Sequence, residues 1–472
     1  MNNTSYSLIF LPTLFLQNFT NVTIKSPIVI NTIGRLFHRI YNPVILMNTK
    51  VIAILAVVVV VAAGAGAAVF LMNGNDSPYR SSDLSGRLAV FGNANNDDYL
   101  DGEDLKVVDD IIAGNKNKDD YPFADANQDG EITNADHEWI EKMINRESMD
   151  IYYLNGFKEV KKIGYPIKRA VVVGTNAAMT MQAIGAVTAG KIVGTTGEAS
   201  KDTYLFSDLN ALPKVSTSVL AADYDAVQEI GNVDTIVTMA SKSYLKNEAT
   251  FTGAEINVVR ISSSDGLEAV SVALTMGYLF QLEDRANEYA KLCDDVLKYI
   301  NEKKKNIDES KPVTTLTMTM TNYVSGTSSD YYELTTMVGA KNLADWSETT
   351  KRFNAGDEWL LNEKYYCDIM LHYHQYSYDP SVDQKDMYTE YRGYFADTQM
   401  VKDGHYRLMN SNMPAIVRLA YTASIMYPEI FGANYGDEIH QQYVDRFLDN
   451  LKAKNYKVTD HKFVFCDSDF GF

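Results

Sequence analysis

Short apolar runs alternate with amphipathic segments from residue 149 to the end of the chain. Buried strands are predicted at residues 169–174, 191–195, 235–239 and 256–261, and helices at residues 177–189 and 224–230. Apolar strands that alternate with helices are typical of an α/β domain whose sheet is largely parallel. The four strand units therefore predict one α/β lobe.

A long amphipathic helix is predicted after this lobe, at residues 284–306. One helical face collects Ala286, Tyr289, Ala290, Cys293, Val296, Leu297 and Ile300. At about 1.5 Å per residue the helix is roughly 35 Å long, enough to join two lobes. A second sheet follows, because Leu316, Met318 and Met320 alternate with threonines, and its later strands are expected at residues 367–371 and 405–409. The predicted fold class is α/β, with two lobes joined by a long helix.

The most hydrophobic segment is residues 51–72, which contain no charged side chain. As a helix it covers roughly 33 Å, the thickness of a bilayer core. Residues 1–50 are basic and contain no Asp or Glu, so the positive-inside rule keeps them cytoplasmic and places the rest outside the cell. We expect a single-pass anchor, a polar linker at residues 73–87 and extracytoplasmic domains. A cleaved signal peptide is the alternative, and a start at Met47 would make the preceding residues a mis-assigned extension.

The charge balance is acidic, with 61 Asp and Glu against 43 Lys and Arg and a net charge of -18. Such a chain repels phosphate backbones, so no nucleic-acid partner is expected. The three cysteines, Cys293, Cys367 and Cys466, are widely spaced, which gives no metal-binding pattern and allows at most one disulfide.

A duplicated pattern of oxygen-bearing side chains precedes the α/β region. Its copies, residues 93–104 and 125–136, place oxygen donors at loop positions 1, 3, 5, 9 and 12. This spacing lets a short loop wrap a hard cation such as calcium, which takes about six to eight oxygens. Gly130 permits the sharp turn at position 6 of the second loop, whereas the first loop has Asp98 there and the neutral Asn93 at position 1. The second site is therefore expected to be tighter.

Both loops end in Asp, and each is followed by a helix without a preceding one. This pattern resembles the dockerin family over residues 91–147, which implies a small helical module at residues 88–148, two calcium ions and a cohesin-like partner domain. The implied ligands of the first ion are Asn93, Asn95, Asp97, the Tyr99 carbonyl, Asp101 and Asp104. Those of the second are Asp125, Asn127, Asp129, the Glu131 carbonyl, Thr133 and Asp136. The Ser-Thr pair with which many dockerins read their cohesin is replaced here by Gly102-Glu103 and Asn134-Ala135.

Four segments of the α/β region share the pattern of one family of binding proteins. They are PIKRAVVVGTNAAMTMQAIGA followed by KIVGTT, YDAVQEIGNVDTIVT, SSDYYELTTMVGAKNLAD and LAYTASIMYPEIF. Together they resemble the substrate-binding proteins of ABC importers for ferric siderophores, haem and cobalamin. The resemblance implies that residues 149–472 form a two-lobed domain that captures such a ligand for a membrane permease. The loop GTNAAM departs from the family's serine- and proline-containing turn.

The solute is expected at the carboxyl ends of the strands, where open α/β sheets bind ligands. The predicted contacts are Thr175, Asn176, Ser241 and Tyr244 in the first lobe, and Tyr323, His372, His374 and Arg392 in the second. Tyrosines stack on planar ligands, the histidines can ligate a metal or haem iron, and the arginine can pair with chelate carboxylates. Polar loop histidines without a ligand are the alternative. By family position, Asp225 and Glu333 would dock to permease arginines, or else are solvated helix charges.

Two other functions stay open. A dockerin-like module also fits a surface enzyme acting on polysaccharide, and a scaffold or adhesion protein would carry an α/β domain that binds no solute. The first strand is not followed by G-x-G-x-x-G, and the chain has neither G-x-S-x-G nor H-E-x-x-H. We therefore expect a binding protein and not an enzyme.

Overall fold

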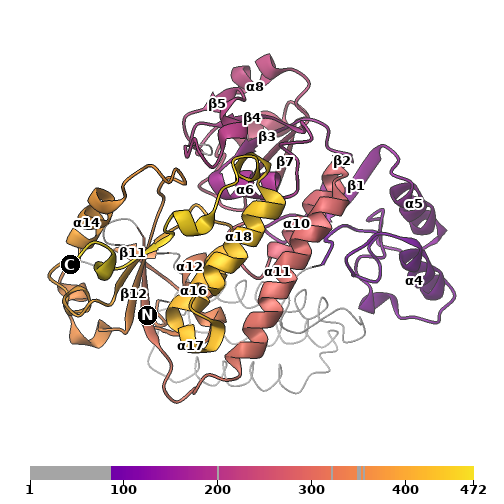
Figure 1. The fold of residues 1–472 in the computed structure, drawn as a ribbon. Coiled ribbons are helices and arrows are strands. Elements are labelled where there is room, and N and C mark those ends of the chain that lie inside the picture. The colour runs from indigo at the N-terminus through magenta and orange to yellow at the C-terminus, as the bar shows by residue number, and fades with distance from the viewer. Residues whose placement is uncertain (1–86, 199–200, 320–322, 348–351, 355–356) are drawn as a thin grey trace, which may run out of the picture. The chain divides into compact units, whose positions relative to one another are not determined.

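The computed structural model describes residues 87–198, 201–319, 323–347, 352–354 and 357–472. The predicted cytoplasmic segment, the anchor and nearly all of the linker lie outside these residues. Within the described ranges, no helix combines the length and the apolar composition needed to cross a membrane. Figure 1 shows the described chain, with the loop–helix module in indigo and the two α/β lobes after it.

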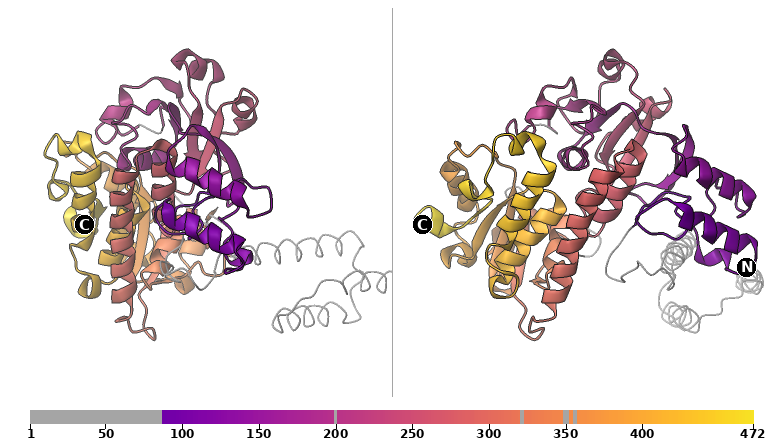
Figure 2. Two further views of the ribbon diagram at one scale, coloured as in Figure 1. Left: turned by 90° about the vertical axis from the view of Figure 1, so that its right-hand side faces the viewer. Right: turned by 45° about the vertical axis from the view of Figure 1, so that its right-hand side comes forward.

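The module at residues 88–148 contains two helices that lie side by side (Figure 2). Helix α4 (Gly102–Ile112) follows the first loop, helix α5 (Asn134–Ile144) follows the second, and the short 3-10 helix η1 (Lys118–Asp120) lies between them. Each α-helix starts with a capping box, formed by Asp101 and Asp104 in α4 and by Thr133 and Asp136 in α5. The predicted order of loop and helix is therefore observed twice.

A β-hairpin connects the module to the first lobe. Strands β1 (Met149–Leu154) and β2 (Val160–Tyr165) pair antiparallel. Val90 forms a bridge with Tyr153, so the start of the module runs along the free side of β1. Leu88, Val90 and Met143 are buried in the same core cluster as the lobes. The module therefore shares a core with the rest of the described chain.

The first lobe is built on a parallel five-stranded sheet in the order β5-β4-β3-β6-β7. Its strands are β3 (Ala170–Val173), β4 (Ile192–Thr196), β5 (Lys214–Ser216), β6 (Thr235–Met239) and β7 (Asn257–Ile261). Its helices are α6 (Thr175–Ala183), α7 (Ser207–Asn210), α8 (Tyr224–Ile230), α9 (Glu248–Thr252) and α10 (Ala269–Phe280). The four predicted strands are confirmed. The fifth, β5, escaped prediction because it has three residues and only Val215 is buried.

The long connecting helix is confirmed as α11 (Glu283–Lys304). All seven residues of its predicted apolar face are buried. It packs along α10, which the sequence patterns did not indicate (Figure 1). The two helices approach so closely that a Cβ at Gly277 would lie 2.2 Å from the Ala286 Cβ.

The second lobe contains a seven-stranded mixed sheet in the order β11-β9-β8-β12-β13-β14, with β10 also paired to β8. The strands are β8 (Thr314–Thr319), β9 (Tyr323–Ser325), β10 (Lys341–Asn342), β11 (Arg352–Asn354), β12 (Ile369–His374), β13 (Tyr406–Asn410) and β14 (Val464–Phe465). The centre of the sheet is parallel, whereas β9, β11 and β14 pair antiparallel. Both faces of β8 are covered, which fits a central parallel strand.

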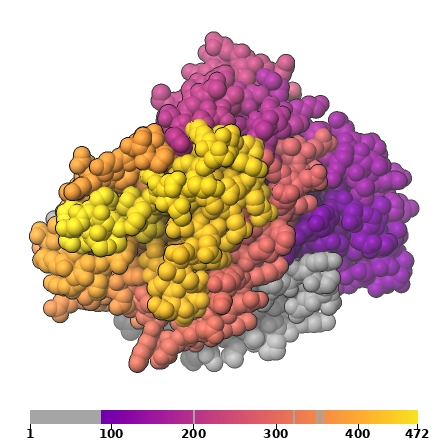
Figure 3. All heavy atoms as spheres, in the orientation of Figure 1, coloured from indigo at the N-terminus to yellow at the C-terminus, as the bar shows by residue number. Residues whose placement is uncertain are grey.

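The helices of this lobe are α12 (Asp330–Met337), α13 (Asp357–Leu360), η2 (Glu363–Tyr365), α14 (Lys385–Gly393), α15 (Gln399–Lys402), α16 (Ala415–Met426), α17 (Pro428–Phe431), α18 (Tyr435–Phe447), α19 (Asp449–Lys452), η3 (Val458–Asp460) and η4 (Asp467–Asp469). Figure 3 shows C-terminal atoms, in yellow, against the first lobe, in magenta. There the Asn450 amide donates to the Leu205 carbonyl at 2.7 Å. Arg285 of α11 also pairs with Asp449 at 2.8 Å. The lobes are therefore joined through α11 and again through α18 and α19.

Candidate functional site

The predicted first-lobe contacts gather at the carboxyl ends of β3 and β6. Thr175 and Asn176 open α6, Ser241 and Tyr244 follow β6, and all four are half-buried. Gly174 has a φ of +107°, and a Cβ there would lie 2.8 Å from the Tyr244 ring. Glycine at this position lets the two loops touch.

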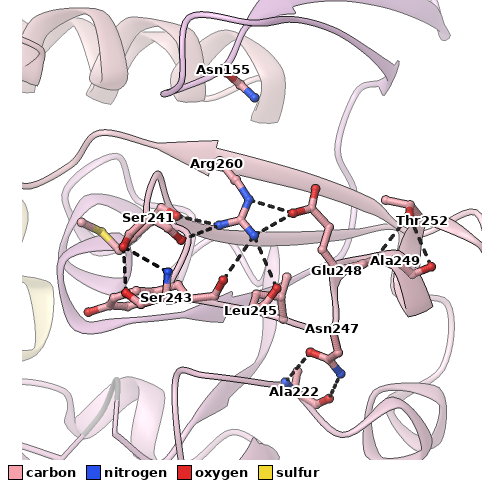
Figure 4. Close-up of polar contacts among 12 residues, drawn as sticks. Asn155, Ala222, Ser241, Ser243, Leu245, Asn247, Glu248, Ala249, Thr252 and Arg260 are labelled. Atoms are coloured by element: carbon pink, nitrogen blue, oxygen red, sulfur yellow. Dashed lines mark hydrogen bonds and ion pairs between the residues drawn. The ribbon is translucent and has the colours of Figure 1, made fainter. Parts of the chain in front are cut away.

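A buried arginine that sequence reasoning missed holds the loop of Ser241 and Tyr244 (Figure 4). Arg260 on β7 is 7% exposed. Its guanidinium donates to the carbonyls of Met239, Ser241, Tyr244 and Leu245 at 3.0 to 3.4 Å. It also pairs with Glu248 of α9 at 2.7 Å. The sequence signal is a charge among the apolar residues Val258, Val259 and Ile261 of this strand.

Aromatic side chains line the corresponding edge of the second lobe. Tyr331 of α12 stacks on Tyr373 of β12, with ring centroids 4.1 Å apart. Arg418 lies over Tyr331 at 5.0 Å and is fully buried. It donates to Asp330 at 3.3 Å and to the Ser264 carbonyl of the first lobe at 3.2 Å. Arg418 therefore ties this aromatic pair to both lobes.

The electrostatics also link the two edges. Burial raises the pKa of Tyr331 to about 12, so its hydroxyl is a neutral donor at pH 7. Burial likewise raises the pKa of Tyr244, and the carboxylates of Glu198 and of Asp330 in the second lobe raise it further. Tyr244 and Asp330 are thus close enough to act on each other across the lobes.

Strand β12 continues through both predicted histidines, which share one face. Their rings lie 5.4 Å (His372) and 3.9 Å (His374) from the Tyr391 ring. His372 is fully buried and its Nδ1 lies 2.8 Å from the Tyr406 hydroxyl, so it is a core residue rather than a surface contact. His374 is half-buried. Burial lowers its pKa to about 4, with a further lowering from Lys201 of the first lobe, so its imidazole is neutral at pH 7.

The other two predicted contacts of the second lobe, Tyr323 and Arg392, interact with residues outside the group described above. Tyr323 on β9 is half-buried, and the Arg352 guanidinium lies 4.9 Å from its ring centroid. Arg392 forms a two-pronged pair with Asp467, at 2.6 and 3.1 Å, and lies over the Phe472 ring. This arginine holds the C-terminal segment, so its predicted role toward a chelate is not supported by its placement.

The two predicted docking carboxylates differ in exposure. Asp225 is exposed on α8, as docking requires. Glu333 is half-buried on α12, where burial and the neighbouring carboxylate of Asp265 raise its pKa to about 8. A half-buried carboxyl whose pKa is raised by burial and by a carboxylate of the first lobe does not fit an exposed docking role. The sequence could not show this, because Asp265 is far away along the chain.

The sheet topology indicates that a residue other than Glu333 is the second-lobe counterpart of Asp225. Helix α8 precedes β6, the strand beside β3, while α13 precedes β12, the strand beside β8. Glu358 of α13 is exposed. It therefore occupies in the second lobe the place that Asp225 occupies in the first.

The first predicted cation loop contains a buried oxygen without a partner. Asn93 is fully buried and its amide donates to the carbonyls of Leu88 and Asp97, at 2.7 and 2.9 Å, while its Oδ1 has no hydrogen-bond partner. Asp104 is also fully buried and accepts from the backbone of Asn95 and Asp101. Buried oxygens of this kind fit a cation ligand set.

The second loop is folded around its own backbone amides. Side-chain oxygens of Asp125, Asn127 and Asp129 accept them at 2.8 to 3.1 Å, and buried Asp136 accepts from the Thr133 amide at 2.8 Å. Gly130 has a φ of +94°, which confirms the predicted turn. Across the described residues, no three His, Cys, Asp or Glu side chains converge into a metal-holding group. A cation here would need the amide, hydroxyl and backbone oxygens that the predicted set includes.

A hollow of about 540 Å³ lies on the module and not at the sheet edges. It is lined by Ile111, Ile112, Lys116, Asn117, Lys118, Ile132, Thr133 and Asn134. It includes one predicted cation ligand, Thr133, and none of the predicted solute contacts. Its isoleucine and lysine side chains are suited to contact a partner protein and not to ligate a cation.

The sequence matches no family model and no curated protein. Several solved structures are similar, among them those of FepB, CeuE and MolA. The TroA-like periplasmic binding protein FepB from Veillonella parvula is 16% identical with a TM-score of 0.51, covering 63% of this chain and 96% of that chain. The fold is that of a periplasmic binding protein.

Two more examples of the periplasmic-binding-protein fold carry metal-containing ligands. CeuE of Helicobacter pylori, in a nickel–histidine complex, is 16% identical with a TM-score of 0.52, covering 66% of this chain and all of that one. The molybdate-binding MolA of Haemophilus influenzae is 16% identical with a TM-score of 0.50, covering 63% and 97%. The two-lobed binding-protein fold predicted from the sequence is thereby confirmed.

Proposed function

We propose that this chain is the extracytoplasmic, membrane-anchored solute-binding component of an ABC importer. Its solute would be a metal chelate such as a ferric siderophore, or a haem or cobalamin. The observation that carries this proposal is the set of groups at the two sheet edges: Tyr244 from one lobe, and from the other His374 and Tyr331, which stacks on the buried Tyr373. Stacked aromatic rings and a neutral imidazole suit a planar or metal-containing ligand.

Because both lobes supply contacts to the solute, binding can drive closure of the lobes. A solute that touches Tyr244 and Tyr331 together binds the closed arrangement better than the open one, and this difference in affinity shifts the population toward closure. Because α11 and the α18–α19 segment both join the lobes, the expected movement is small.

Isothermal titration of the purified chain against ferric siderophores, haem, cobalamin, nickel–histidine and molybdate tests the proposal. One ligand class should bind. Tyr331→Ala should weaken that binding up to about tenfold, since an aromatic contact is worth about 0.5 to 1.5 kcal/mol. Tyr366→Ala is the matched control, because this exposed tyrosine lies before β12, away from its carboxyl end. If none of these five ligand classes binds, the proposed solute-binding function is rejected.

For the permease partner, we infer that Asp225 and Glu358 are the docking carboxylates. Both are exposed on helices that precede equivalent strands. The double variant D225K/E358K should abolish solute-dependent stimulation of the permease ATPase and leave solute affinity unchanged. Glu333→Gln should leave both intact, and a loss of stimulation there would restore Glu333 as the docking residue.

For the module, we propose two calcium ions and a cohesin-like partner domain. The carboxylate-rich loops and the unpartnered Asn93 Oδ1 support the ions, and the isoleucine-lined hollow supports a protein partner. Asp125→Ala should cost more calcium affinity than Asn93→Ala, because a carboxylate attracts the cation more strongly than an amide. Calcium titration by calorimetry measures both. Equal losses would contradict the proposed ranking of the sites.

A further inference from the structure

We propose that the loop–helix module and the solute site are coupled through the β1–β2 hairpin, so that a cation in the first loop orders the loop of Ser241 and Tyr244. This inference rests on the cation proposal above. It assigns the hairpin, which lies between the two predicted ligand sets, a role in binding.

The cation loop is hydrogen-bonded to the start of the module. The Asn93 amide group donates to the Leu88 carbonyl at 2.7 Å, and the Leu88 amide donates to the Asp97 carbonyl at 3.2 Å. A cation held by the Asn93 Oδ1 would fix this side chain and with it the position of Leu88. The cation loop and the segment at residues 88–91 therefore become ordered together.

The segment at residues 88–91 is in turn hydrogen-bonded to the hairpin. The Phe91 amide donates to the Tyr152 carbonyl at 2.9 Å, and the Leu154 amide donates to the Ala89 carbonyl at 3.0 Å. Val90 between them is fully buried. The segment therefore pairs with β1 through a single bridge and covers part of its outer edge. Losing this pairing would remove two backbone hydrogen bonds from β1 and expose that edge.

The hairpin turn at Gly156 contacts the strand ends that carry the predicted solute site. The Gly156 amide donates to the Arg260 carbonyl at 2.7 Å, and the Ser262 hydroxyl donates to the Gly156 carbonyl at 2.9 Å. A Cβ at Gly156 would lie 2.6 Å from the Ala240 Cβ, one residue before Ser241. In Figure 4, Asn155 of the same turn is drawn above Arg260, whose side chain holds the loop.

The physical basis of the coupling is the change in order of the first loop. Asp97 and Asp104 are nearly or fully buried, and without a cation their repulsion loosens the loop. The pairing of residues 89–91 with β1 then frays, and the turn at Gly156 loses part of its support. Because binding free energies are linked, a solute that fixes the Ser241 loop should in turn tighten the cation site by the same factor.

Hydrogen exchange of the full chain, read by mass spectrometry with calcium or with chelator, tests the coupling without a known solute. Chelation should speed exchange at Gly156 and residues 239–245 by about tenfold or more. Residues 214–216, at the opposite edge of the same sheet, should not change. Calorimetry on the same sample reports calcium binding. Calcium that binds without changing exchange at residues 239–245 overturns the coupling alone, whereas absence of calcium binding overturns both proposals.

Variants in the hairpin locate the connection. Gly156→Ala should abolish the calcium effect at residues 239–245 and leave calcium affinity unchanged. Gly164→Ala is the matched hairpin control, because its Cβ would approach only Asp150 Oδ1, at 4.0 Å, and it should preserve the effect. Should Gly156→Ala fail to fold, Ser262→Ala removes one hydrogen bond to the turn and should reduce the effect by at least half. A full calcium effect in Ser262→Ala would place the connection elsewhere.

Discussion

At the residue scale, Arg260 organises a loop that contains no regular structure of its own. One guanidinium satisfies four carbonyls and a carboxylate around the Ser241–Tyr244 turn. Arg260→Met keeps the side-chain length and removes every donor. We expect the free energy of unfolding to fall by about 2 kcal/mol, because buried acceptors would lose their partner. Urea unfolding measures this, with Lys246→Met, an exposed neighbour, as the control. A loss equal to that of the control would contradict the role of Arg260.

His374 makes stability depend on pH. Burial lowers its pKa from 6.5 to about 4 in the folded chain. Between these values the unfolded chain binds the proton more readily, so the free energy of unfolding should fall as the pH drops from 6.5 to 4. Because part of the ring is exposed, we expect a loss of about 1 kcal/mol. His374→Gln should remove this part of the slope, while buried His440 keeps its own contribution in both proteins. An NMR titration of the ring gives the pKa directly, and a value near 6.5 would refute the prediction.

At the element scale, Gly277 is the point at which α10 approaches α11 most tightly against a side chain that an added Cβ would meet. Gly277→Ala would place a Cβ 2.2 Å from the Ala286 Cβ, so the helices must separate. We expect about 1 to 3 kcal/mol of destabilisation, the usual cost of overpacking. Gly393→Ala, at the end of α14, has nothing within 4 Å of its Cβ and should be neutral or slightly stabilising. Thermal unfolding compares the two variants, and equal melting temperatures would show that α10 and α11 are not close-packed here.

Local patterns predicted the strands that are largely buried and the helices whose burial is strongly one-sided. The helix and strand expected at residues 224–230 and 235–239 coincide with α8 and β6, and the apolar face of α11 is buried as expected. Helix α10 was missed because almost all of its residues are buried, which removes the periodicity that marks a helix. For the site, the alternation of side chains along the strand placed His372 and His374 on one face. The sequence could not show how deeply they are buried, because the residues that cover them, Tyr391 and Tyr406, belong to later elements.

At the scale of the whole molecule, the two lobes are held together by more than the predicted connecting helix. Asp202 of the first lobe accepts from the Tyr378 amide of the second at 2.9 Å, and Thr188 donates to Asp449 at 2.7 Å. Such contacts resist large rotations between lobes. The solute site is therefore expected to change by small local movements, for which the Ser241 loop and α12 are the nearest candidates.

The pairing of residues 89–91 with β1 also determines where the chain can be cut. A fragment that starts at residue 149 retains both lobes but leaves the outer edge of β1 unpaired. Exposed strand edges pair with other chains, so this fragment should aggregate during purification. A fragment that starts at residue 87 keeps the edge covered and should stay monodisperse in light scattering. Equal behaviour of the two would show that the hairpin protects its own edge.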